Sequence, residues 1–205
     1  MTKPTGCWAG HSDIRMYSSN DQNIQGLIER IKSPDDAISG AAWQSAGPCG
    51  AAAVQPLAGL MAESDFELAR KGKRALYLVV RQAGHPGAAG ESRAVERELI
   101  VVLGSSPSEV RRQVVWMLSE IGSARAVGPM AALLTDKALR EDARCALTRL
   151  PSRAAVRALK AAFATAPEDF KPALAESLRV RGEKVEGYPS RKLVPTAQTT
   201  VVPAK

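Results

Sequence analysis

The sequence predicts an all-α protein, an α-α superhelix of about five stacked helical hairpins. The 205 residues are 45% hydrophobic but only 4% aromatic, so the apolar material is mostly small or aliphatic and suits closely packed helices. Apolar residues recur at helical spacing in many segments. The same apolar pattern also returns several times along the chain, with a period of the length typical of repeat architectures.

The repeated unit is clearest in Val110, Val114 and Leu118, which are spaced by four residues. The same spacing returns in other parts of the chain: Leu68, Gly72 and Leu76; Leu139, Ala143 and Leu147; Phe170, Leu174 and Leu178; and, more weakly, Ala37 and Ala41. Successive copies begin 31, 42, 29 and 31 residues apart. The longer interval predicts an insertion, which we place in the loop-forming run His85 to Gly90.

A second apolar pattern lies between these copies, at residues 53–57, 126–130 and 155–159. Each unit therefore holds two helical segments separated by Gly, Ser or Pro, which predicts a helical hairpin. A single hairpin is too small to bury its own apolar face, so neighbours must stack into one continuous core. The helices are expected at about 22–31, 35–45, 51–62, 66–83, 92–103, 108–121, 124–134, 138–149, 153–164 and 168–181.

Two of the helix starts carry capping signals. Ser106 followed by Pro107 and Glu109 predicts an N-cap, a proline in the first position and an acidic first turn. The run Ser33 to Asp36 repeats this chemistry. These signals agree with the period and support the division into hairpins.

The repeat pattern defines the expected domain organisation. Residues 21–182 form the repeat domain, and residues 1–20 are an N-terminal cap or a flexible arm. Residues 183–205 contain Gly187, Pro189 and further prolines without helical periodicity, so we expect an extended or disordered C-terminal tail.

The motifs resemble the HEAT repeat family, in particular its short bacterial HEAT-like repeats of the phycobilisome-lyase type. The resemblance covers roughly residues 23–182. It rests on the first-helix signature Ala-Val-x-Pro-Leu at 53–57, with Met130 in the last place at 126–130, and on an Arg after the aliphatic residue of the second helix, at Arg111 and Arg140. It implies a right-handed α-solenoid whose second helices line the concave side.

Signals for catalysis or metal binding are sparse. The two histidines, His11 and His85, lie in an expected tail and loop without an orienting neighbour, and Cys7, Cys49 and Cys145 are far apart. The sequence therefore predicts a protein that is not an enzyme and has no metal site and no cofactor.

The longest apolar run, Leu76 to Val80, is bounded by Arg74 and Arg81, far short of the roughly 20 residues that a membrane span needs. We expect no membrane insertion. The odd number and wide spacing of the cysteines predict a reducing, cytoplasmic location.

The candidate site comes from projecting the second helices at 100° per residue. Arg112 and Trp116 then lie opposite the apolar row of their helix, and the same register brings Ser39, Trp43, Ser119 and Cys145 to this side. Arg, Trp and Tyr dominate protein-binding hot spots because they offer large contact area and several donors. The predicted partner-binding residues are Arg70, Arg74, Tyr77, Arg112, Trp116 and Arg144.

Several interpretations of these predicted binding residues stay open. The tryptophans could instead fill gaps between hairpins, which we favour for Trp43. The expected partner is another protein or an acidic peptide. Nucleic acid is a weaker alternative, since residues 137–165 hold seven basic and two acidic side chains but the net charge of the whole chain is only +7. The family resemblance alone suggests a third function, as a bilin lyase or chaperone.

Overall fold

The computed structural model of the chain describes residues 23–190 and is entirely helical in its regular structure. The all-α prediction is confirmed for this part of the chain. The N-terminal cap or arm predicted for residues 1–20 lies outside the described residues, as does the tail from residue 191.

A helical segment at residues 23–31 opens the described chain. The elements that follow are α2 Asp36–Gln44, the 3₁₀ helix η1 Gly47–Ala53, α3 Val54–Met61, α4 Phe66–Ala83, α5 Ala89–Ser105, α6 Ser108–Ile121, α7 Ala124–Ala132, the 3₁₀ turn η2 Leu133–Thr135, α8 Arg140–Arg149, α9 Arg153–Thr165 and α10 Lys171–Val180.

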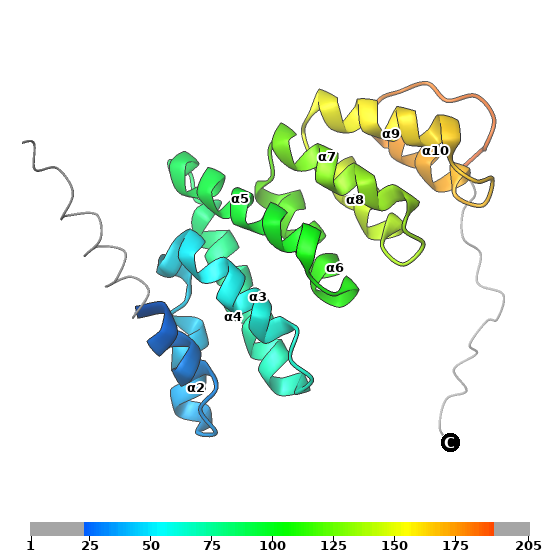
Figure 1. Cartoon of the computed structure of the whole chain (residues 1–205). Helices are drawn as coiled ribbons and strands as arrows, with labels where there is room; N and C mark the ends of the chain where they lie inside the picture. The colour runs from blue at the N-terminus through cyan, green and yellow to red at the C-terminus, as the bar shows by residue number, and fades with distance from the viewer. Residues whose placement is uncertain (1–22, 191–205) are drawn as a thin grey trace, which may run out of the picture.

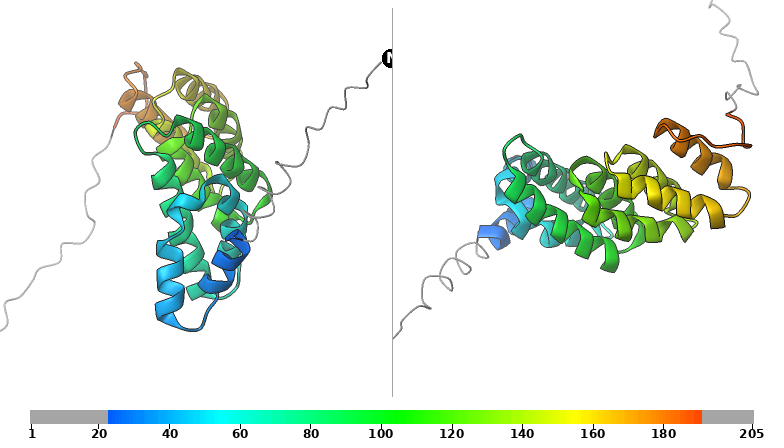
Figure 2. Two further views of the ribbon diagram at one scale, coloured as in Figure 1. Left: turned by 90° about the vertical axis from the view of Figure 1, so that its left-hand side faces the viewer. Right: turned by 90° about the horizontal axis from the view of Figure 1, so that it is seen from above.

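The helices form two layers of a hairpin array (Figure 1). In the first-helix layer α3 packs against α5, α5 against α7 and α7 against α9; in the second-helix layer the contacts run from α2 through α4, α6 and α8 to α10. Seen from above, the hairpins follow one another from the blue to the orange end (Figure 2). Residues about one repeat apart in sequence therefore lie on neighbouring helices of one layer.

The predicted insertion is found, and most of it is the non-helical connection between α4 and α5. α4 continues to Ala83, and α5 begins at Ala89, three residues earlier than expected, and ends at Ser105. Only residues 84–88 remain as a connection, which contains Gly87 at φ 91°. The predicted loop is therefore found over residues 85–88, while Ala89 and Gly90 belong to the first turn of α5.

Helix starts are capped by short polar side chains at Asp35, Asp65, Ser123 and Ser152. The cap predicted at Ser106 is wrong. Ser106 ends the longer α5 by donating its backbone N–H to the Val102 carbonyl, and Pro107 takes the cap position of α6 without a side-chain hydrogen bond.

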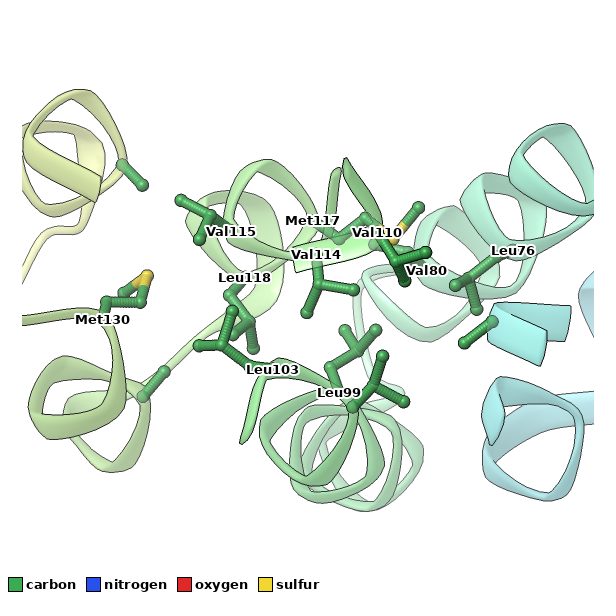
Figure 3. Packing of buried hydrophobic residues seen from close by; sticks show 14 of the residues in the cluster. Leu76, Val80, Leu99, Leu103, Val110, Val114, Val115, Met117, Leu118 and Met130 are labelled. Atoms are coloured by element: carbon green, nitrogen blue, oxygen red, sulfur yellow. The ribbon is translucent and has the colours of Figure 1, made fainter. Parts of the chain in front are cut away.

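The core runs continuously through the stack, and Figure 3 shows side chains from α4, α5, α6 and α7 meeting between the layers. The repeat positions Val114, Leu118, Ala143 and Leu147 are completely buried, which confirms the pattern. The register predicted for the weak first copy of the pattern is wrong. Ala37 and Ala41 are exposed, whereas Ser39 and Ala42 are buried.

Residues 183–190 have no helix, as expected of the predicted tail, but they pack along the last hairpin. The Tyr188 ring meets Phe163 of α9 edge to face at a centroid distance of 5.6 Å. Arg179 of α10 donates to the carbonyls of Val185 at 3.3 Å and Gly187 at 2.8 Å. This part of the tail therefore covers the end of the array.

Candidate functional site

Two tryptophans of the second-helix layer each carry an arginine from the next hairpin. The Arg74 guanidinium of α4 lies 5.5 Å from the ring centroid of Trp43 on α2, and that of Arg149 on α8 lies 5.7 Å from the ring centroid of Trp116 on α6. Both arginines are exposed, and both rings are half-buried. Stacking on an indole attracts the guanidinium and restricts its rotamers while leaving its N–H donors accessible from solvent.

Tyr77 lies between the two stacks in the order of the helices. Its side chain is half-buried against the core. The pKa of the Tyr77 hydroxyl is raised, first by burial and then by the Glu120 carboxylate, and the cations Arg81 and Arg149 offset part of this rise. This coupling places the Tyr77 hydroxyl in the electrostatic field of charges from α4, α6 and α8.

Arg112 and Trp116 are joined through Asp142 of α8. Arg112 Nε donates to Asp142 Oδ2 at 3.1 Å, and Trp116 Nε1 donates to Asp142 Oδ1 at 2.9 Å. Arg112 also donates to both Glu109 oxygens and to the Ala138 carbonyl. Hydrogen bonds to Glu109 and Asp142 raise the pKa of Arg112 further. Arg112 therefore links neighbouring hairpins and has few donors left for a partner.

The remaining predicted residues, Arg70 and Arg144, also have partners within the chain. Arg70 pairs with Glu67 one turn earlier on α4. Arg144 donates to Glu141 at 2.8 Å and reaches Ser177 Oγ on α10 at 2.7 Å, with 19% of its side chain exposed. Arg144 thus joins α8 to α10, whereas Arg70 stays at the surface.

Two serines predicted on the outer side are buried. Ser39 is completely buried and accepts a hydrogen bond from Lys71 Nζ of α4 at 2.8 Å; Ser119 is 6% exposed and donates to the Trp116 carbonyl. A second helix packs against a neighbour on each side as well as against its own first helix. The polar side of the helix is therefore narrower than a single-helix projection predicts.

Of the six predicted residues, the structure keeps Arg74, Tyr77 and Trp116 on a common surface and adds two others to them. We call this set the stacked-arginine row: Trp43, Arg74, Tyr77, Trp116 and Arg149. Sequence reasoning missed Arg149 and Asp142. The repeat period could have found both residues, because residues one repeat apart lie on neighbouring helices: Asp142 follows Arg112 by 30 residues, and Arg149 follows Trp116 by 33.

Other chemistry is limited in residues 23–190. Cys49 and Cys145 are free thiols, and burial raises the pKa of Cys49. In the same residues no group of three His, Cys, Asp or Glu side chains is placed to hold a metal ion. Nor does this part of the chain contain a helix with the length and hydropathy of a membrane span.

Comparison with known proteins adds little. No protein-family model matches the chain, and no curated protein matches it. Among solved structures, the chain is similar to an engineered protein with 18% sequence identity and a TM-score of 0.41 over 87% of each chain.

Proposed function

We propose that the protein is a non-catalytic, HEAT-like scaffold of the cytoplasm that binds another protein through its second-helix layer. The observation that carries the proposal is the pair of Arg–Trp stacks. Within residues 23–190 neither Arg74 nor Arg149 forms an ion pair, although most of the neighbouring cations do. Two oriented guanidinium groups with available donors form a recognition surface for carboxylates.

The row also supplies apolar contact area. Tyr77 and the two tryptophans are half-buried, so each presents part of a rigid ring at the surface. Binding a partner against side chains that are already held in place costs little additional conformational entropy. The partner that fits is an acidic segment carrying apolar side chains, which would pair with the arginines and cover the exposed ring edges.

The test is affinity capture from the native cell with three forms of the full chain: wild type, the double variant Arg74→Gln with Arg149→Gln, and Arg157→Gln. Arg157 is an exposed arginine of α9 in the other layer, so its variant controls for loss of charge. We expect partners held by the wild type and by Arg157→Gln to be lost with the double variant. Crosslinks should map to α4, α6 and α8.

Equal partner sets from all three forms would refute the role of the row. Circular dichroism distinguishes a specific loss of partners from a folding defect of the double variant. Each cation–π contact at an exposed site contributes only about 0.5–1 kcal/mol, so the double variant should keep its helical spectrum.

A further inference from the structure

The opposite layer holds a second surface whose chemistry the row does not explain. Between α5 and α7 lies a hollow of about 370 Å³, lined by Arg93, Glu96, Arg97, Ile100, Val101 and Arg125. Five of these residues belong to α5 and follow one side of that helix at intervals of three and four residues. The hollow is therefore formed by one stripe of α5, closed by the first turn of α7. We call it the α5–α7 hollow.

Positive charge predominates at the rim of the hollow. Arg93, Arg97 and Arg125 are exposed, whereas Glu96 is 1% exposed. The Glu96 carboxylate accepts two hydrogen bonds from Ser123, one from its backbone N–H at 2.6 Å and one from its hydroxyl at 3.0 Å. The ion pair from Arg97 to Glu98 is long, at 3.9 Å, and Glu98 also accepts from Gln55. Three arginines thus surround the opening, and the nearest buried carboxylate faces inward.

The lining between the arginines is aliphatic. Val101, in the last turns of α5, is 48% exposed, and Ile100 beside it is half-buried. Apolar surface surrounded by cations is complementary to an apolar side chain flanked by carboxylates. The volume lies at the lower end of the range for ligand pockets, which suits one or two side chains rather than a large cofactor.

We propose that the α5–α7 hollow binds a short acidic peptide segment of another protein, with an aliphatic side chain seated on Ile100 and Val101. Carboxylates on either side of that anchor pair with Arg93, Arg97 and Arg125. This surface lies on the first-helix layer and is independent of the stacked-arginine row, so the scaffold has two sites that could hold two partners at once.

The shape and chemistry of the hollow favour a peptide over other anions. Among residues 23–190 no aromatic side chain lines the hollow, so this part of the chain offers a nucleic acid base no ring on which to stack. Its aliphatic lining consists of Ile100 and Val101 alone, among three arginines, whereas membrane binding needs a larger apolar face that enters the lipid.

The test uses fluorescence anisotropy of a fluorescein-labelled peptide, EDLLDE, titrated with the full chain at low and moderate salt. We expect saturable binding that weakens with salt. The double variant Arg97→Gln with Arg125→Gln should weaken it roughly tenfold or more, and Val101→Gln several-fold. The peptide EDGGDE, which lacks the anchor, should bind more weakly to the wild type.

Matched controls separate this site from the proposed function. The titrations are made in the Arg74→Gln with Arg149→Gln background, in which the row cannot contribute to peptide binding. In this background Val180→Gln, at a more exposed valine on α10, and Arg157→Gln, at an exposed arginine of α9, should leave peptide affinity unchanged. Absence of saturable binding, or an equal loss with these controls, overturns the proposal. Displacement of the peptide by oligo(dT) or by phosphatidylserine vesicles overturns the choice of a peptide as the occupant.

Discussion

The indole N–H of Trp116 on α6 donates to Asp142 Oδ1 on α8 at 2.9 Å, while the other oxygen of the same carboxylate holds Arg112. One carboxylate with 20% of its side chain exposed therefore holds two side chains of the neighbouring hairpin. We predict that Asp142→Ala lowers the free energy of unfolding by about 1–3 kcal/mol, because a half-buried donor and a cation lose their acceptor.

Urea unfolding followed by circular dichroism measures this effect. The matched control is Glu109→Ala, which removes the other carboxylate on Arg112 but from a side chain that is 80% exposed. It should cost less than about 1 kcal/mol. Equal losses for both variants would contradict the role assigned to Asp142.

At Gly72, α4 lies close to α3. A Cβ at this position would lie 2.7 Å from Leu60 Cβ and 3.2 Å from the Leu57 carbonyl oxygen. We predict that Gly72→Ala destabilises the protein by about 1–3 kcal/mol through overpacking, despite the better helix propensity of alanine. Gly59 of α3 has open space around its Cβ position, so Gly59→Ala should stabilise by about 0.5–1 kcal/mol. Thermal melting of both variants checks the opposite signs.

Arg181, just after α10, binds the turn between α8 and α9. It donates to the carbonyls of Thr148 at 3.0 Å, Leu150, and Ser152 at 3.4 Å. Arg181→Ala should leave these carbonyls without this donor and destabilise the last hairpin by about 1–3 kcal/mol. Hydrogen exchange should then accelerate in α10 while α3 and α4 keep their protection. Uniform acceleration would argue against a local effect, and Arg157→Ala serves as an exposed-arginine control.

The covering segment 183–190 should detach in acid. Hydrogen bonds from Lys171 and from the Tyr188 hydroxyl lower the pKa of Glu168 from its ordinary value of 4.5. The contribution of Glu168 to stability is therefore complete above that value and is lost as the pH falls through the lowered pKa. Exchange of the amides at 185–188 should accelerate over this acidic range.

Tyr188→Phe provides the comparison for this acid effect, because it lacks the hydroxyl that donates to Glu168 at 2.7 Å. Its segment should exchange faster already at neutral pH and respond less to acid. Protection that persists unchanged in the wild type at the most acidic pH at which the helices stay folded would show that the Glu168 contact does not hold the segment.

The sequence by itself determined the hairpins, most of their boundaries and the buried positions from α4 onward. These features follow from local rules, since a 3.6-residue apolar period and short breakers specify a helix and its buried side without reference to other helices. The errors in the Ser106 cap and in the register of Ala37 and Ala41 arise because these local rules leave out the neighbouring helices. A helix end or a register can shift by a turn or by one residue when the neighbouring hairpin offers a better contact.

Only the tertiary structure decided which outward side chains meet. The pairs Trp43 with Arg74 and Trp116 with Arg149 come from neighbouring hairpins, and so does Arg112 with Asp142. Such pairs depend on the shift and rotation between adjacent hairpins, which no single helix encodes. The α5–α7 hollow has the same cause, because its apolar stripe becomes a binding surface only where α7 closes one side of it.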